Sequence, residues 1–179
     1  KNTTQQFGAI SKFFHWSIFV LLTAQLYLIW MFYSLSQEDP SRGNYMFLHK
    51  SIGLTILMLA ILWIIWRWFN TQPTPIPNKQ NWQNTLAKIT HTLLLIALVI
   101  LPLSGILMGM AAGRNLDWFG IYTLTPASFM PQNEIIGGAL NTAHTIIGYS
   151  LIALICLHII GALIHHFYYK DDVLKRMWP

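Results

Sequence analysis

The last long apolar run of the chain, residues 140–168, contains four of the seven histidines. His144 and His158 are fourteen positions apart, and at ~100° and ~1.5 Å per residue an α-helix would place both rings on one face, roughly 21 Å apart. His165 continues the same stripe. A run this long and apolar can cross a bilayer, where ionisable side chains are costly and face protein, a cofactor or water. Two histidines at different depths therefore indicate two cofactors stacked across the membrane.

Composition indicates the same class of protein. Hydrophobic residues make up 54% of the 179 positions and charged residues only 9%, which is typical of an integral membrane protein. The single cysteine, Cys156, lies inside the last apolar run, so neither a disulfide framework nor a thiolate metal site is expected. Residues 1–10 are polar and do not resemble a cleavable signal peptide.

Four apolar stretches are each long enough to cross a membrane as a helix. They cover residues 13–33, 46–69, 85–110 and 140–168. Because there is no internal repeat, the sequence predicts a single domain over residues 1–179. We expect an all-α, integral membrane four-helix bundle with up-and-down topology.

The connecting segments are predicted from their turn residues. Residues 34–45 contain proline, glycine and charges and are expected to form a solvated turn. Residues 71–84 carry three prolines at alternate positions, from Pro73 to Pro77, and are expected to be a stiff, non-helical surface connector. Residues 111–139 are rich in aromatic side chains and are expected to fold as short pieces at the membrane interface.

The distribution of basic residues predicts the orientation of the bundle. Most of the 11 Lys and Arg residues fall on the side shared by the two termini, which includes the short charged tail 170–179. That side has Lys1, Lys12, Arg67, Lys79, Lys88, Lys170, Lys175 and Arg176, against Arg42, Lys50 and Arg114 on the other. By the positive-inside rule both termini are cytoplasmic. The bias also accounts for the formal net charge of +5 without a nucleic-acid partner.

Depth in the membrane then decides which histidines can share a metal ion. His49 and His144 both lie near the outer ends of their predicted helices, whereas His15 and His158 belong to the inner half. Histidine pairs at two depths satisfy the axial ligation of two b-type haems, one in each leaflet. The predicted pairs are His15 with His158 and His49 with His144.

The residues alone leave other interpretations of these histidines open. A single membrane histidine can simply hydrogen-bond a neighbouring helix. Zinc would need three or four ligands at one level, usually with a carboxylate, and no Asp or Glu lies inside any predicted span. The same absence of carboxylates disfavours a proton relay within the membrane.

Several short motifs carry a resemblance to a known family. They are His15-Trp16, Leu48-His49-Lys50-Ser51-Ile52-Gly53, Arg67, Thr90-His91, Leu101-Pro102-Leu103-Ser104-Gly105, residues 114–118, His144 through His158, and the ending from His165-His166 to Lys170-Asp171. Together they cover essentially the whole chain. The sequence resembles the bacterial cytochrome b561 family of four-helix dihaem membrane cytochromes, which also resemble the cytochrome b subunits of hydrogenases and formate dehydrogenases.

The resemblance implies cofactors, a location and a reaction. It implies two haem b groups held by the four paired histidines in a multi-pass protein of the bacterial inner membrane. His91 and His165 match positions near the cytoplasmic haem, where quinone binds. At least one family member is a superoxide oxidase that passes an electron from periplasmic superoxide through two haems to ubiquinone. Other members resemble generic quinone-linked carriers, which would serve a separate redox partner.

Charged and polar residues are candidates at both ends of this electron path. On the outer side, Lys50 and Arg114 could attract anionic superoxide or bind haem propionates; that side has three bases and four acids, a sum of −1. On the inner side, His91 and His165 could hydrogen-bond the quinone carbonyl oxygens. Arg67 could steady the reduced quinone or a propionate. The alternative is that His165 and His166 are ordinary interfacial residues that reach towards the lipid headgroups.

Overall fold

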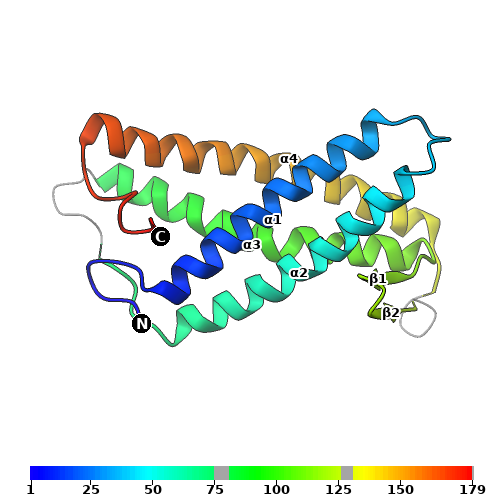
Figure 1. The fold of residues 1–179 in the computed structure, drawn as a ribbon, viewed down its shortest axis with the longest axis horizontal. Helices are drawn as coiled ribbons and strands as arrows, with labels where there is room; N and C mark the ends of the chain where they lie inside the picture. Colours follow the sequence, from blue (N-terminus) through cyan, green and yellow to red (C-terminus); the bar gives the residue numbers. More distant parts are fainter. Residues whose placement is uncertain (75–80, 126–130, 179) are drawn as a thin grey trace.

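The computed structural model describes residues 1–74, 81–125 and 131–178 and confirms the predicted four-helix bundle (Figure 1). The helices are α1 (Ala9–Ser34), α2 (Arg42–Trp68), α3 (Asn81–Ala111) and α4 (Glu134–Ile164), and α4 continues as a short π-helix, η2 (His165–Tyr169). A two-stranded antiparallel hairpin, β1 (Leu116–Trp118) and β2 (Tyr122–Leu124), lies between α3 and α4 in the chain.

All four helices begin earlier than the sequence predicts, α1 at Ala9 instead of residue 13 and the other three at Arg42, Asn81 and Glu134. The segments 42–45, 81–84 and 134–139 are helical, so the non-helical expectation for these residues is wrong. At α4 the cause is local: the side chain of Asn133 accepts a hydrogen bond of 3.0 Å from the Ile136 amide and caps the helix. Glu134 adds negative charge to the first turn, where it favours the helix dipole. The expectations for Pro75, Pro77 and Lys79 fall outside the described residues.

The bundle is built from two helical hairpins. Helix α1 packs on α2 and α3 packs on α4, while a seam between α2 and α3 joins the two hairpins. The buried core at this seam consists of Ile18, Ile56, Ala60 and Leu98. Ala60 is fully buried, and its small side chain allows the helices to approach closely. Among the described residues, α4 makes no comparable backbone packing with α1 or α2.

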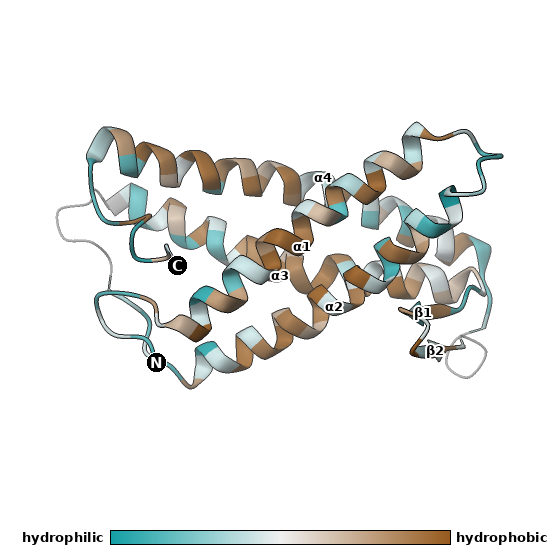
Figure 2. Cartoon of the chain, in the orientation of Figure 1, coloured by the Kyte–Doolittle hydropathy of each residue, from teal (hydrophilic) through white to brown (hydrophobic). Residues whose placement is uncertain are grey.

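Hydrophobic residues predominate along all four helices (Figure 2). Large side chains such as Trp30, Leu62, Ile96 and Ile160 are exposed along all four helices. The four candidate spans have mean hydropathies of 1.6, 2.0, 2.6 and 2.3 over their most apolar windows. Exposing so large an apolar surface to water would cost free energy. We therefore expect lipid to cover it.

Both chain termini lie at the same end of the bundle (Figure 1). The tail expected to be merely charged packs back on the start of α1: the amide of Phe7 donates to the Arg176 carbonyl at 3.3 Å. The indole of Trp16 donates to the Met177 carbonyl at 2.9 Å, and its ring lies edge-on to Trp178. Which membrane face this end occupies remains a prediction from the charge distribution.

The β1–β2 hairpin lies at the opposite end of the bundle, against α2. Ser51, which is fully buried, donates to the Asp117 carbonyl and accepts from the Phe119 amide, each at 3.1 Å. The indole of Trp118 donates to the Thr55 hydroxyl at 3.1 Å. These bonds fix the hairpin, the expected short structured piece, beside the helix that carries His49.

Candidate functional site

Three histidines from three different helices meet in the half of the bundle nearer the termini. The ring centroids of His15 on α1 and His158 on α4 are 6.2 Å apart. His91 on α3 lies closer to His158, with centroids 5.1 Å apart. His15 and His158 are half-buried, whereas His91 is exposed. The indole of Trp63 lies against His15 at 6.3 Å.

A second histidine pair lies further from the termini. The ring centroids of His49 on α2 and His144 on α4 are 6.3 Å apart, and the planes are inclined by 82°. Both pairs therefore bridge the side of the bundle where α4 does not pack on α1 or α2. The structure brings together the histidines that depth alone had paired, while their role as ligands remains a prediction.

The spacing of both pairs fits a metal ion held between two imidazoles. A metal–imidazole bond is ~2 Å and the ring nitrogen lies about 1.1 Å from the ring centre, so two rings on opposite sides of one ion have centroids about 6 Å apart. The 6.2 and 6.3 Å separations match this value. The separation of 5.1 Å between His91 and His158 is too short for such a pair.

Unpartnered polar atoms lie next to both pairs. Nδ1 of His15 and Nδ1 of His49 are buried without a hydrogen-bond partner among the described residues. The same holds for Nε1 of Trp63 and Oε1 of Gln25. Buried polar atoms are rarely left unpaired. These four atoms therefore indicate that a group other than protein lies beside each histidine pair.

The ring of His144 is held by the Leu101–Gly105 segment of α3. Its Nδ1 lies 3.0 Å from the Leu101 carbonyl oxygen and 3.0 Å from the Ser104 hydroxyl. Donation from Nδ1 to the carbonyl leaves Nε2 with a lone pair for a metal ion, which is the usual arrangement around histidine ligands. Gly105 leaves space for the ring, because a Cβ there would lie 3.0 Å from Cε1 of His144.

A compact metal site is not formed by these residues. Within the described ranges, no group of three or more His, Cys, Asp or Glu side chains could hold a metal ion. Paired histidines without a carboxylate suit an iron whose other ligands come from a macrocycle. The donor set thus fits haem and does not fit structural or catalytic zinc.

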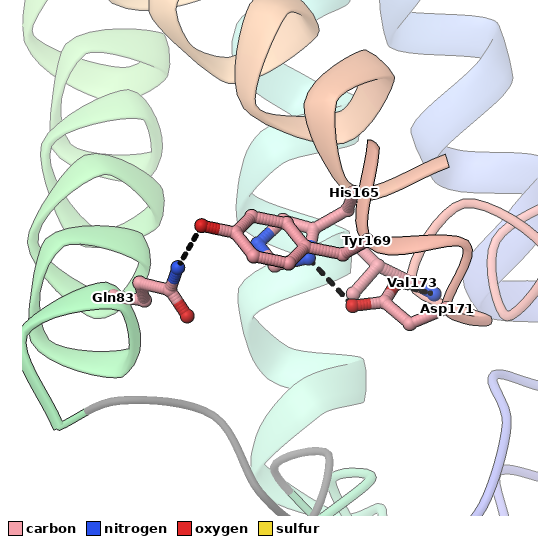
Figure 3. A network of polar contacts seen from close by, with 5 residues as sticks. All are labelled: Gln83, His165, Tyr169, Asp171 and Val173. Atoms are coloured by element: carbon pink, nitrogen blue, oxygen red, sulfur yellow. Dashed lines mark hydrogen bonds and ion pairs between the residues drawn. The ribbon is translucent and has the colours of Figure 1, made fainter. Parts of the chain in front are cut away.

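His165 lies at the end of α4 in a separate polar network (Figure 3). Its Nδ1 is 2.6 Å from Oδ2 of Asp171, and its ring stacks on Tyr169 with centroids 5.1 Å apart. Gln83 of α3 donates to the Tyr169 hydroxyl at 2.8 Å. The ring of His165 is therefore fixed from two directions.

The predicted cations lie at different places in the bundle. Arg67 is half-buried in the last turn of α2 and interacts electrostatically with His91. Lys50 is half-buried directly after His49, and Arg114 is exposed between α3 and β1. In the described part of the chain, none of the three forms an ion pair with a carboxylate.

Sequence reasoning missed several residues around these histidines. The Leu101–Gly105 motif was noticed, but its contacts with His144 depend on how α3 faces α4. Asp171 belongs to the closing motif of the sequence, but the sequence predicts no role for its carboxylate. Its position six residues after His165, just past the apolar run, was the available signal.

Comparisons with known proteins agree with this geometry. The family model described as prokaryotic cytochrome b561 matches residues 6–179. The chain is 32% identical to "Cytochrome b561 homolog 2" of Escherichia coli (strain K12) over 179 residues, 98% of this chain and 93% of that protein. It is 31% identical to "Cytochrome b561 homolog 1" of the same organism, covering 73% of each. It is 27% identical to "Probable superoxide oxidase CybB" of Yersinia pestis, covering 74% of this chain and 73% of that protein.

Proposed function

Because the chain belongs to the prokaryotic cytochrome b561 family, whose members are membrane electron-transfer proteins with haem b, we propose that it carries electrons from superoxide to ubiquinone through two haems. The reaction balances as two superoxide anions, one quinone and two protons giving two dioxygen molecules and one quinol. The bundle would lie in the bacterial inner membrane with both termini in the cytoplasm.

The observation that carries this proposal is the pair of histidine separations. His49 with His144 would hold the outer haem, and His15 with His158 the inner one, at 6.3 and 6.2 Å between ring centroids. Bound haem would supply one-electron redox chemistry.

The outer end has side chains suited to an anionic substrate. Lys50 adjoins the ligand His49, and neither Lys50 nor Arg114 is neutralised by a carboxylate within the described ranges. Unpaired cations raise the encounter rate of an anion with the surface near them. We assign to these two residues the attraction of superoxide towards the outer haem.

The inner end has groups suited to a quinone. His91 is exposed and lies beside His158, and Arg67 lies on the neighbouring helix. His165 lies seven residues after His158, about two helical turns nearer the termini. Imidazoles can donate hydrogen bonds to quinone carbonyls, and a guanidinium can stabilise the charge that reduction creates.

A second candidate function is electron transfer between quinone and a separate redox protein. It is favoured by the relatives themselves, because the two of higher identity are named only as cytochrome b561 homologues, whereas the relative named for superoxide is 27% identical. The two candidate functions differ only in the partner that exchanges electrons at the outer end. Both use the same two haems and the same quinone site at the inner end.

Stopped-flow spectroscopy tests the proposal. Superoxide mixed with oxidised protein should reduce the haems rapidly, and added ubiquinone should reoxidise them with formation of quinol. Lys50→Glu should slow haem reduction and make it less sensitive to salt, whereas Arg42→Glu, an equal charge change on the same side, should have a smaller effect. If superoxide disappears by spontaneous dismutation before it reduces the haems, superoxide is excluded as the electron donor. That result would favour a separate redox protein as the donor.

A further inference from the structure

Asp171 is held in place independently of its contact with His165. Its Oδ1 accepts a hydrogen bond of 3.0 Å from the Val173 amide, while Oδ2 faces Nδ1 of His165 at 2.6 Å (Figure 3). The backbone amide of Asp171 also donates to the His165 carbonyl at 3.2 Å. The two side chains are largely shielded, with 13% of His165 and 20% of Asp171 exposed. The His165–Asp171 contact is therefore a defined part of the fold and not an incidental surface contact.

This geometry fixes the tautomer of His165. An ionised carboxylate can only accept hydrogen bonds, so the ring proton must lie on Nδ1. Nε2 then carries a lone pair when the ring is neutral and a second proton when the ring is charged. One edge of the imidazole is committed to Asp171, and the other edge is available for proton exchange.

We infer that Asp171 is a positioning residue that holds His165 so that Nε2 can pass protons to quinone. This inference rests on the proposed function, in which quinone receives two electrons and needs two protons to become quinol. His165 would give its Nε2 proton to a carbonyl oxygen of the reduced quinone and keep the proton on Nδ1, which stays hydrogen-bonded to Asp171. Nε2 would then regain a proton from water at the end of the bundle where the termini lie.

Tyr169 and Gln83 support the same arrangement from the other side of the ring. The stack of Tyr169 on His165 has an interplanar angle of 29°, which prevents the ring from turning without displacing the tyrosine. Gln83 holds the tyrosine hydroxyl from α3. The imidazole is thus pre-oriented before any ligand arrives, which lowers the cost of reaching a reactive geometry.

A purely structural role for Asp171 is the alternative, since it also ties the C-terminal tail to η2. The substitution Asp171→Asn separates the two roles. The Val173 amide needs an acceptor, so the asparagine oxygen would face Val173 and its NH2 group would face Nδ1 of His165. The turn would be kept, but Nδ1 would have to accept and the ring proton would move to Nε2. A neutral ring in that tautomer cannot receive a proton at Nε2.

The neighbouring Asp172 provides a matched control. Its side chain is exposed and forms an ion pair with Lys175, at 2.9 Å. That hydrogen bond holds the pKa of Asp172 below its usual value, so Asp172 is charged. Asp172→Asn removes the same charge from the same end of the bundle without touching His165.

The experiment is reoxidation of dithionite-reduced protein by ubiquinone-1, followed in H2O and in D2O. Asp171→Asn should keep the wild-type haem spectrum and slow reoxidation about 100-fold, with a larger solvent isotope effect, while Asp172→Asn behaves as wild type. Asp171→Glu should restore part of the rate. Nitrogen-15 NMR of histidine-labelled protein should place the His165 proton on Nδ1 in the wild type and on Nε2 in Asp171→Asn.

The possible failures are distinguishable. Wild-type protein that ubiquinone does not reoxidise would refute the proposed function, and this inference with it. Slow reoxidation in His165→Gln together with wild-type rates in Asp171→Asn would leave the quinone site standing and overturn the role of Asp171. An unchanged tautomer in Asp171→Asn would overturn it as well.

Discussion

The imidazole of His144 lies against Gly105 so closely that a Cβ atom on Gly105 would come within 3.0 Å of its Cε1 and 3.3 Å of its Nδ1. Four positions earlier on the same face of α3, the Leu101 carbonyl lies 3.0 Å from that Nδ1. The Ser104 hydroxyl also donates to this carbonyl, at 2.6 Å. The motif therefore supplies both the space and the hydrogen bond that orient one ring.

Gly105→Ala should displace His144 and weaken the outer haem site. Haem content measured as the pyridine haemochrome should fall from two towards about one per chain, because a ligand moved by a few tenths of an ångström loses coordination geometry. Gly109→Ala is the control on the same helix, since nothing lies within 4 Å of a Cβ there. Two haems with wild-type potentials in Gly105→Ala would contradict this account of the motif.

Removing single ligands should remove single haems. His49→Ala or His144→Ala should abolish the outer haem, and His15→Ala or His158→Ala the inner one, since each pair lies at its own level with centroids 6.3 or 6.2 Å apart. Redox titration with optical detection should show one b-type component remaining in each variant. Loss of both haems from a variant that is still folded would show that the pairing is wrong.

His91→Leu should retain both haems and slow the reoxidation of the inner haem by ubiquinone. The reason is the short separation of 5.1 Å from His158, which places His91 beside that ligand and not across an iron from it. Haem reduction from the outer side should keep its wild-type rate. Should the variant instead lose the inner haem, His91 and not His15 would be the partner of His158.

Ser51→Ala should destabilise the outer end of the bundle. The substitution leaves the Phe119 amide without its acceptor and the Asp117 carbonyl without this donor, in two part-buried hydrogen bonds around the fully buried Ser51. The expected loss is about 1–3 kcal/mol in the free energy of unfolding in detergent. Ser150→Ala, which removes an exposed hydroxyl bonded only to its own helix, should change stability much less. Equal stabilities of the two variants would contradict the role given to Ser51.

The sequence predicts the helices well because apolar runs of membrane length have few alternative structures. The sequence also predicts which histidines lie at the same depth in the membrane. The helical rise per residue converts a position in the sequence into a depth along the span. It does not predict where α4 begins, because the Asn133 cap acts through one side chain and not through hydropathy.

Contacts between distant segments were harder to foresee. The burial of Trp16 under the C-terminal tail joins residues 161 positions apart and has no periodic signal. The pairing of Asp171 with His165 depends on the π-helix and on Lys170, whose φ of 53° reverses the chain. Such a turn is unfavourable for a lysine, so propensity alone argues against it.

The division of the bundle into two hairpins has a consequence for its assembly. Each histidine pair joins the α1–α2 hairpin to α4, and α4 otherwise packs mainly on α3. Under the proposed function, each haem would join the α1–α2 hairpin to the α3–α4 hairpin. These two hairpins can insert into the membrane one after the other. Haem supply would then set the fraction of chains that reach the closed form, since ligand binding stabilises only that form. Chains made during haem shortage would be those in which α4 is not tied to the α1–α2 hairpin.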